Sequence, residues 1–293
     1  MPATPSTMLV YLNGHFLPKD QATLSVEDRG TLFGDGVYEV LEYYDGRPFA
    51  MQGHLDRLRQ SLAGIRLPAP AAVDRLPEIS DELLRRNHLT HARLYWQVTR
   101  GPAPRNHLPP DEPTPTVLAI PTPIAPLNVR APVQCWKAIT HDDLRWARCC
   151  YKTLMLLPNT LAKDEARRAG CQEAILHRNG TVTEGSATNV LAVCDGALWT
   201  HPADASILHG ITRAIAIDLA RALGLALHET ALTVEQLRAA EEVMVTGTTA
   251  RVTAITHVDG HPIGAGEAGP VTTRLHETFL KQLSQQCQPA GCT

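Results

Sequence analysis

Lysine, aromatic residues and long apolar runs are all scarce in this chain of 293 residues. Aromatic residues make up 5% of it, and no apolar run approaches the ~18 residues needed to span a bilayer. The first residues, MPATPSTMLVYLNGH, lack the basic and apolar regions of a signal peptide. The net charge is −3 and the sequence has no basic patch. We therefore expect a globular protein without membrane or nucleic-acid partners.

Cysteine and histidine spacing argues against two further classes of protein. The seven cysteines lie at positions 135, 149, 150, 171, 194, 287 and 292, and none forms a C-x-x-C pair. This scatter argues against a disulfide framework or a zinc site and favours a reducing cytoplasm. The 13 histidines show no H-E-x-x-H or similar spacing, so no metal site is expected.

Lysine accounts for five of the 27 basic residues. Four of the five lie in polar, charged, terminal or short strand-like contexts, namely Lys19, Lys137, Lys163 and Lys281. Lys152, in contrast, precedes the apolar run 154–157. An isolated lysine beside apolar residues usually extends its ammonium group to water along its methylene stem. The alternative is a desolvated amine, which is a nucleophile toward carbonyl groups.

The length of the chain favours two domains. A proline-rich linker at 124–132 is expected to join an N-terminal α/β domain, 1–123, to a C-terminal α/β domain, 133–293. Alternation and turn residues predict a hairpin at 8–18 and strands at 37–44, 91–100, 117–120, 133–140, 173–177, 181–184, 188–193, 197–200 and 242–246. Apolar residues at helical spacing and helix-end signals predict helices at 52–65, 77–87, 159–169, 210–224 and 270–285.

Several polar residues allow two interpretations when each is considered alone. Glu184 follows a hairpin in TVTEGS and could be a turn carboxylate. Arg57 lies off the apolar stripe of its helix and could be a solvated charge. Arg105 and His107 flank Asn106 in a proline-rich loop. If this segment is extended, both side chains face one side of it; alternatively, the loop is only a polar connector. Thr212 lies near the start of the helix predicted at 210–224 and could be a cap or a phosphate ligand.

Taken together, these motifs resemble the fold-type IV aminotransferases, which use pyridoxal 5'-phosphate. The resemblance covers about residues 8–285 and includes EDRGTLFGDGVYEV, Lys152 and EAILHRNGTVTEGSATNV. It implies an α+β, two-domain architecture with the cofactor between the domains. It also implies that Lys152, in the C-terminal domain, holds the cofactor as a Schiff base, and that Glu184 hydrogen-bonds the pyridine nitrogen and keeps it protonated.

The same resemblance assigns the remaining cofactor contacts. Arg57 would contact the phosphate, and Leu208 would pack beside the cofactor ring. The phosphate would also be held by the residues Ile211, Thr212 and Thr248. The motif R-x-H at Arg105 and His107 resembles the carboxylate trap of the D-amino acid aminotransferases, which branched-chain aminotransferases lack. The other substrate-binding residues would be Tyr38 and Thr249.

These matches favour a cytoplasmic, homodimeric D-amino acid transaminase. It would move an amino group from a donor such as D-alanine to a 2-oxo acid such as 2-oxoglutarate by a ping-pong reaction. The alternatives are an (R)-selective amine transaminase, a branched-chain aminotransferase, an aminodeoxychorismate lyase, and a catalytically silent cofactor-binding or structural protein. The sequence departs from the family pattern at Ala187, Thr188 and His209, which leaves the range of substrates open.

Overall fold

The computed structural model describes residues 8–287. Within them the chain forms two compact units, the first comprising residues 8–127, 151–155 and 285–287 and the second comprising residues 128–150 and 156–284. Residues 151–155, which include Lys152, group with the first unit, although the sequence analysis placed them in the C-terminal domain. The predicted linker at 124–132 and the outer bounds of the two domains remain predictions. Both units mix helices and strands, as the α+β class requires.

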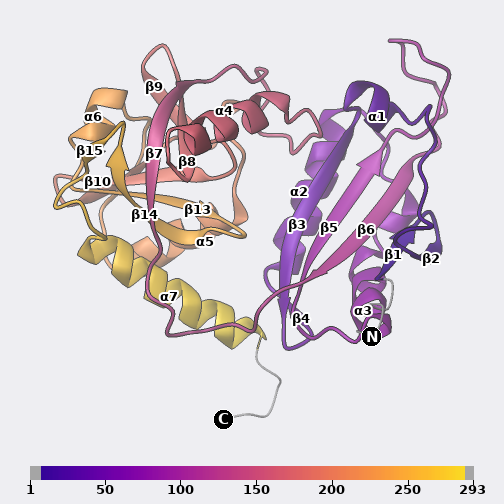
Figure 1. Ribbon diagram of the computed structural model, residues 1–293, viewed down its shortest axis with the longest axis horizontal. Helices are drawn as coiled ribbons and strands as arrows, with labels where there is room; N and C mark the ends of the chain where they lie inside the picture. Colours follow the sequence, from indigo (N-terminus) through magenta and orange to yellow (C-terminus); the bar gives the residue numbers. More distant parts are fainter. Residues whose placement is uncertain (1–7, 288–293) are drawn as a thin grey trace. The chain divides into compact units, whose positions relative to one another are not determined.

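The first unit contains an antiparallel sheet in the order β2-β1-β6-β5-β3-β4 (Figure 1). Its strands are β1 Leu9–Leu12, β2 His15–Pro18, β3 Gly36–Tyr44, β4 Arg47–Pro48, β5 Ala92–Thr99 and β6 Thr116–Pro123. Asn13 and Gly14 both have positive φ, which is the geometry of the tight turn predicted between β1 and β2. Strand β6 is longer than the predicted 117–120 because it pairs with β5 along its whole length.

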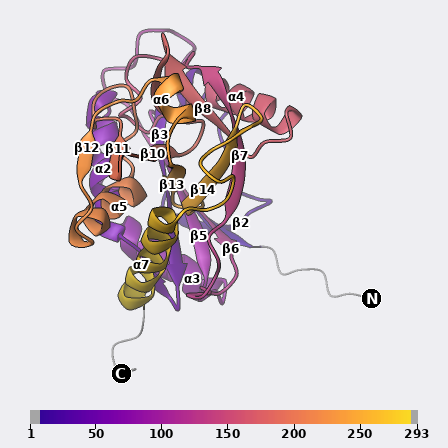
Figure 2. The same cartoon turned by 90° about the vertical axis from the view of Figure 1, so that its left-hand side faces the viewer.

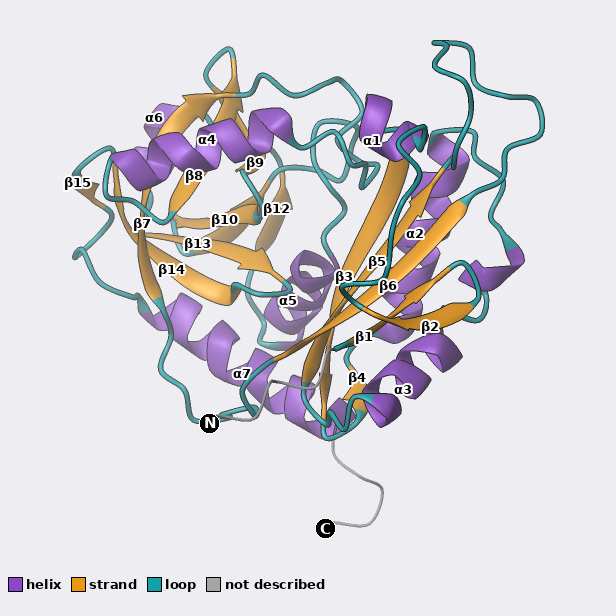
Figure 3. Cartoon of the chain, turned by 45° about the vertical axis from the view of Figure 1, so that its right-hand side comes forward, coloured by secondary structure: helices purple, strands orange, loops and turns teal. Residues whose placement is uncertain are grey.

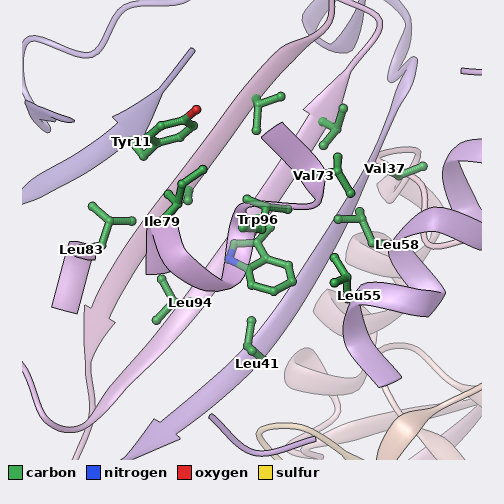
Figure 4. Close-up of a cluster of buried hydrophobic side chains, with 14 of the residues drawn as sticks. Tyr11, Val37, Leu41, Leu55, Leu58, Val73, Ile79, Leu83, Leu94 and Trp96 are labelled. Carbon is green, nitrogen blue, oxygen red and sulfur yellow. The ribbon is translucent and has the colours of Figure 1, made fainter. Parts of the chain in front are cut away.

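Helices α2, Met51–Gly64, and α3, Leu76–Arg86, pack on one face of this sheet. Trp96 of β5 is fully buried among apolar residues from both helices (Figure 4). Its indole N–H donates to Ser80 Oγ at 2.9 Å, so the buried donor is satisfied. The buried residues of β5 alternate along the strand, as the sequence predicted. This packing makes β3 and β5 a firm support for the polar residues at their ends.

A short helix that the sequence analysis missed, α1 Arg29–Phe33, lies beside the ends of β5 and β6. Asp28 caps it, because one carboxylate oxygen accepts from Gly30 N at 2.8 Å. The other oxygen of Asp28 accepts from the hydroxyls of Thr99 at 2.9 Å and Thr116 at 2.7 Å. A buried carboxylate thus fixes α1 to two strands of the sheet. A further short 3₁₀ helix, η1, spans Ala71–Val73.

Backbone hydrogen bonds explain why residues 151–155 group with the first unit. Thr153 forms an isolated antiparallel bridge with Val37, and Leu154 N donates to Gly36 O at 3.0 Å. A side chain at position 36 would collide with this segment, since a Cβ atom there would lie 2.8 Å from Leu154 Cδ1. The sequence analysis could not predict this pairing because residues 36 and 154 lie far apart in the sequence.

The second unit contains a sheet in the order β12-β11-β10-β13-β14-β7-β8-β9, with β15 paired to β14 (Figure 2). Its strands are β7 Cys135–Asp142, β8 Glu173–Arg178, β9 Thr181–Gly185, β10 Asn189–Cys194, β11 Ala197–Thr200, β12 Leu227–Glu229, β13 Glu242–Gly247, β14 Arg251–Val258 and β15 His261–Pro262. The pairs β11–β12, β14–β7 and β7–β8 are parallel, and the others are antiparallel.

The helices of this part of the chain are α4 Leu157–Arg168, α5 Ile211–Ala222, α6 Val234–Arg238 and α7 Pro270–Cys287. Helix α4 packs on β8 and β7, and α5 packs on β13 and β14. Helix α4 starts before the predicted residue 159 because Pro158 is tolerated in a first turn. Helix α6 and strand β12 were not predicted. Among residues 8–287, no helix combines the length and apolar character needed to cross a bilayer.

Candidate active site

Lys152 lies on the first unit, next to the start of β3. Its backbone N–H donates to Ser61 Oγ at 3.0 Å, and its carbonyl accepts from Tyr38 N at 2.9 Å. The half-buried side chain places Nζ 4.2 Å from the centroid of the Tyr38 ring. Within residues 8–287, this ammonium makes no hydrogen bond or ion pair with a carboxylate. An amine held in this way against an aromatic face differs from a lysine that merely extends to water.

Tyr38 itself is held by β3 and its neighbour β5. Its ring stacks on Tyr95 with centroids 5.6 Å apart. Burial, with a smaller contribution from Tyr38, raises the pKa of Tyr95 to about 12, so Tyr95 is a neutral hydrogen-bonding group. The Tyr95 hydroxyl donates to Gln97 Oε1 at 2.7 Å. The two tyrosines and Lys152 therefore form one aromatic and basic cluster.

Arg57 is buried rather than solvated, which corrects the simple interpretation of its position off the apolar stripe. Glu39 of β3 accepts from its Nε at 2.7 Å and from its Nη2 at 2.9 Å. His54 Nδ1 lies 2.8 Å from the same carboxylate. Burial alone would raise the pKa of Glu39, but Arg57 and His54 outweigh it and lower that pKa to about 2. Glu39 thus fixes the direction of the Arg57 guanidinium by a bidentate pair.

Arg105 and His107 lie in the loop between β5 and β6, which extends beyond the ends of those strands (Figure 3). Both side chains are exposed. Arg105 Cζ lies 5.5 Å from the centroid of the Phe33 ring, and the His107 ring lies 5.7 Å from it. The structure therefore brings the two residues to one aromatic side chain, Phe33. Among the described residues, neither forms a bond with Tyr38.

Glu184 is the next-to-last residue of strand β9 in the second unit and is buried. Its carboxylate accepts hydrogen bonds from Arg145 Nη1, from Asn189 Nδ2 at 2.8 Å and from Leu208 N at 3.0 and 3.1 Å. The sequence analysis missed Arg145 and Asn189. Burial raises the pKa of Glu184 to about 7, although Arg145 and the Leu208 N–H act in the opposite direction. The carboxylate is therefore poised near neutrality and depends on Arg145 for its charge.

Arg145 is in turn fixed by Asp143. Its Nε and Nη2 donate to the two oxygens of Asp143, each at 2.8 Å. Despite burial, which acts in the opposite direction, Asp143 and Glu184 raise the pKa of Arg145 above its ordinary value. The signal in the sequence was the run 142–145, DDLR, in which a carboxylate precedes an arginine by two residues. Sequence spacing could not show that Arg145 would reach Glu184.

The first turn of α5 forms a donor-rich region in the same unit. The helix starts after Gly210, and no side chain of the described residues caps its first N–H groups. Ile211 and Thr212 are the first two residues of the helix, and Thr212 is buried. Uncapped N–H groups at a helix start favour an anion such as phosphate. Thr248 and Thr249 lie in the turn that follows β13.

The backbone is tightly packed where this helix begins. A Cβ atom at Gly210 would lie 1.9 Å from Asn189 Oδ1. Asn189 Nδ2 donates to Leu208 O at 2.8 Å as well as to Glu184, so one amide holds both residues. Thr246, which faces Asn189 across the β10–β13 ladder, has a buried hydroxyl without a partner in the described residues. This unit therefore holds an unused donor close to Asn189.

The residues present fit the groups of pyridoxal phosphate. Three N–H groups donate to Glu184, and the Leu208 N–H is shared between its two oxygens. A carboxylate oxygen accepts more than one hydrogen bond, so a pyridine N–H can share this carboxylate with them. The uncapped start of α5 suits a phosphate, and the Lys152 amine suits an aldehyde. No three His, Cys, Asp or Glu side chains within residues 8–287 group together to hold a metal ion.

The three departures from the family pattern have different surroundings. Thr188 is buried, and its hydroxyl donates to Glu173 Oε2 at 3.0 Å. Ala187 is exposed in the same turn. His209 Nε2 lies 3.1 Å from the Asp204 carbonyl oxygen. Thr188 thus has a local structural role, because it satisfies a buried carboxylate.

Comparisons with known proteins agree with this geometry. A family model described as amino-transferase class IV matches residues 36–258. The D-alanine aminotransferase of Listeria monocytogenes serotype 1/2a (strain 10403S) is 44% identical over 282 residues, which cover 96% of this chain and 98% of the relative. The D-alanine aminotransferase of Staphylococcus haemolyticus is 40% identical over 282 residues, covering 94% of this chain and 98% of the relative.

Solved structures show the same fold. The branched-chain amino acid aminotransferase from Escherichia coli has a TM-score of 0.88 and 30% identity, with 98% of each chain covered. A branched-chain amino acid aminotransferase from T.th., solved with pyridoxamine 5'-phosphate, has a TM-score of 0.87 and 31% identity, covering 97% of this chain and 96% of that one. The predicted fold-type IV architecture is confirmed. The chain belongs to the class IV aminotransferases.

Proposed function

We propose that this enzyme is a pyridoxal phosphate-dependent transaminase that moves an amino group from a D-amino acid to a 2-oxo acid. D-alanine and 2-oxoglutarate are the expected donor and acceptor. The presentation of Arg105 and His107 together on Phe33 carries this proposal. The full-length similarity to two D-alanine aminotransferases supports it. In the first half of the ping-pong reaction, the donor gives up its amino group and leaves as an oxo acid. In the second half, the acceptor binds and takes the amino group.

Pyridoxal phosphate supplies a ring that accepts the electrons released when the substrate Cα–H bond breaks. Lys152 would hold the cofactor through its amine until the substrate amine takes its place. The freed Lys152 amine would then serve as the base that takes the proton from the substrate Cα and as the acid that gives it up again. The Tyr38 ring 4.2 Å from Nζ limits where that amine can move.

Glu184 would keep the pyridine nitrogen protonated, which is what lets the ring accept electrons. Arg145 would keep Glu184 ionised, because it is the charged donor to that buried carboxylate. Leu208 would lie beside the ring, held by the hydrogen bonds of its N–H to Glu184 and its carbonyl to Asn189. The protonation of the ring would thus depend on an ion pair as well as on Glu184.

The phosphate would be bound by the first turn of α5, through Ile211 N–H, Thr212 N–H and the Thr212 hydroxyl. Thr248 would add a contact from the turn after β13. Arg57 would add a permanent positive charge whose direction Glu39 fixes. These contacts bind the cofactor without taking part in proton transfer.

The substrate carboxylate would be bound by Arg105 and His107, with Tyr38 and Thr249 as further substrate contacts. Arginine offers a planar, permanently charged fork that matches a carboxylate, and histidine adds a second donor. Holding the carboxylate fixes which hydrogen on Cα faces the base. The position of these side chains therefore decides the preferred enantiomer.

Four alternatives predict different behaviour. A branched-chain aminotransferase, the class of the solved neighbours above, would prefer L-leucine. An (R)-selective amine transaminase would not need a carboxylate, and a lyase such as aminodeoxychorismate lyase would not need Arg105 and His107. A silent cofactor-binding or structural protein would show no spectral change with any donor. The R-x-H motif favours the D-amino acid transaminase over the first three, and the absorption of the bound cofactor separates it from the fourth.

The deciding assay compares D-alanine, L-alanine and L-leucine as donors to 2-oxoglutarate. We expect D-alanine to be used fastest and to change the visible absorption of the bound cofactor. Faster use of either L-amino acid would reject the D-specific proposal in favour of a branched-chain type enzyme. An unchanged absorption spectrum with all donors would reject enzymatic transamination.

The proposal includes a homodimer in the cytoplasm. Five large apolar side chains of the second unit are exposed, namely Val129, Leu144, Trp146, Leu157 and Leu161. Leu157 and Leu161 are one helical turn apart on α4, so they lie on one face of that helix. The described cysteines form no disulfide with one another, which is compatible with a reducing compartment. A mass of two chains in sedimentation velocity would support the homodimer. Fractionation of the source cells would test whether the protein lies in the cytoplasm.

A further inference from the structure

The loop that carries Arg105 and His107 needs support, because both side chains are exposed. The loop joins β5 to β6, and proline recurs along it at positions 102, 104, 109, 110, 113 and 115. Proline stiffens a segment but supplies no backbone N–H to fasten it. The position of the two proposed carboxylate ligands must therefore be fixed by other groups.

Arg29 provides that fastening. It begins α1 and is 4% exposed. Its Nη1 donates to Asn106 O at 2.6 Å, and its Nη2 donates to His107 O at 3.4 Å. These are the two carbonyls on either side of the His107 Cα atom. One guanidinium thus fixes the main chain at the centre of the R-x-H motif.

Arg29 is itself held from behind. Its Nε donates to Asp35 Oδ2 at 2.8 Å, and Arg100 Nε donates to the same oxygen at 2.8 Å. Arg100 also donates to Ile65 O at 2.8 Å and to Arg66 O at 3.1 Å, just beyond the end of α2. The loop is therefore connected through two arginines and one carboxylate to the helical layer of the first unit.

Phe33 connects Arg29 to the two proposed ligands. Arg29 Cζ lies 4.7 Å from the centroid of the Phe33 ring, and the same ring faces Arg105 and His107. The face of an aromatic ring attracts cations and restricts where a flexible guanidinium can point. Arg29 and Phe33 therefore act on the backbone and on the side chains of the same short loop segment.

From these contacts we propose that Arg29 is a positioning residue for substrate carboxylates, acting through Asn106, His107 and Phe33. Arg29 does not touch the substrate. It holds the loop in the conformation in which Arg105 and His107 converge, which lowers the ordering needed when a carboxylate binds. This inference rests on the proposed carboxylate-binding role of Arg105 and His107.

The first test measures the loop without reference to catalysis. Trypsin can cleave the exposed Arg105–Asn106 bond only when the loop leaves its fixed conformation. Lysine cannot reproduce the three donations of Arg29, so Arg29→Lys should increase the cleavage rate at that bond about fivefold or more. Arg86→Lys is the matched control, because Arg86 also lies over a phenylalanine, Phe16, at 4.3 Å, but does not touch the loop. The control should be cleaved like the wild type.

The second test measures the substrate. Arg29→Lys should raise KM for D-alanine and 2-oxoglutarate about tenfold, and should leave the rate with (R)-1-phenylethylamine as donor unchanged at saturating acceptor. A wild-type value for either the cleavage rate or KM in the folded variant overturns the proposal. If Arg29→Lys fails to fold, Phe33→Leu decides: a raised KM with a wild-type melting temperature supports the proposal, and an unchanged KM overturns it.

The same assays separate this inference from the function on which it rests. Arg105→Leu with an unchanged KM for D-alanine would reject the proposed carboxylate site, whatever Arg29 does to the loop. A raised KM in Arg105→Leu, together with wild-type behaviour of Arg29→Lys and Phe33→Leu, would reject the positioning role alone.

Discussion

Arg145 donates a hydrogen bond to Glu184 inside the second unit, and both side chains are removed from water. Replacing Arg145 would leave the buried Glu184 carboxylate without its charged partner, whereas Arg145 would keep its pair with Asp143 if Glu184 were replaced. The pair also has a chemical consequence, since burial raises the pKa of Glu184 to about 7 even with Arg145 present. The ionisation of Glu184 is therefore sensitive to any change at Arg145.

Glu184→Gln should slow turnover on the order of 10²–10³-fold. Glutamine keeps a hydrogen-bonding group but no negative charge, so the pyridine nitrogen would lose its proton more readily and electron acceptance by the ring would weaken. Steady-state rates with D-alanine and the pH dependence of the cofactor absorption measure both effects. Turnover at wild-type speed would show that Glu184 is only a turn residue.

Arg145→Met should shift the pH dependence of activity to higher pH. Without the guanidinium, the pKa of Glu184 should rise above about 7, because the charge that favours its ionised form is lost. An acid with a raised pKa is protonated below that value, so activity at pH 7 should fall and recover as the pH increases. Arg178→Met is the control, because Arg178 also pairs with Asp143 but, within the described chain, donates no hydrogen bond to Glu184. If activity recovered over the same pH range in both variants, this role of Arg145 would be contradicted.

Lys152→Ala should abolish nearly all turnover and the cofactor adduct that borohydride makes permanent. The reason is that Lys152 holds its amine against Tyr38, with no carboxylate partner among the described residues. Lys163→Ala is a suitable control, because Lys163 is exposed and pairs with Glu173 at 3.3 Å. Peptide mapping of the reduced protein identifies the modified residue. A cofactor attached to Lys163 or Lys137 would refute the assignment.

How much the sequence predicted depended on the range of each interaction. Local signals succeeded: Asn13-Gly14 marked the first turn, and alternation located β5 and its buried face. Partners distant in sequence could not be found in this way. Glu39 lies 18 residues from Arg57, and Arg145 lies 39 residues from Glu184. A motif shows which side chains carry chemistry, but the fold decides which charges surround them.

Helix α1 shows the same limit on a smaller scale. Five residues carry little helical propensity on their own, so the sequence analysis predicts no helix in EDRGTLFGDG. Its stability comes from tertiary contacts instead, because Asp28 reaches hydroxyls on β5 and β6. The grouping of Lys152 with the first unit also depends on such contacts, with Gly36 and Ser61.

The ionised Glu39 should make the free energy of unfolding depend on pH in the acidic range. Its pKa is about 2 in the folded chain against 4.5 ordinarily, so the folded state binds fewer protons between these values. Its contribution is present above pH 4.5 and is lost as the pH falls toward 2, on the order of 3 kcal/mol in all. The difference in unfolding free energy between wild type and Glu39→Gln, measured by urea denaturation, should therefore shrink from pH 7 to pH 3.

Glu82→Gln provides the matched control for that experiment. Arg85 and Arg86 lower the pKa of Glu82 to about 2 as well, but both arginines are exposed on α3 and Glu82 is partly exposed. Solvent and salt screen such pairs, so this variant should change stability and its pH dependence little. Equal effects of the two substitutions would contradict the importance of burial around Glu39.

Arg105→Leu should raise KM for D-alanine and 2-oxoglutarate together. A lost charge-assisted pair with a carboxylate is worth roughly 2–5 kcal/mol, which corresponds to about 30-fold or more in affinity. Leucine keeps an apolar contact with Phe33, which lies 5.5 Å from the Arg105 guanidinium, so the loop itself should stay in place. An amine donor without a carboxylate, (R)-1-phenylethylamine, should react at the wild-type rate. Initial rates over a grid of donor and acceptor concentrations measure these values, and equal losses for the amine and the amino acid would exclude a carboxylate-binding role for Arg105.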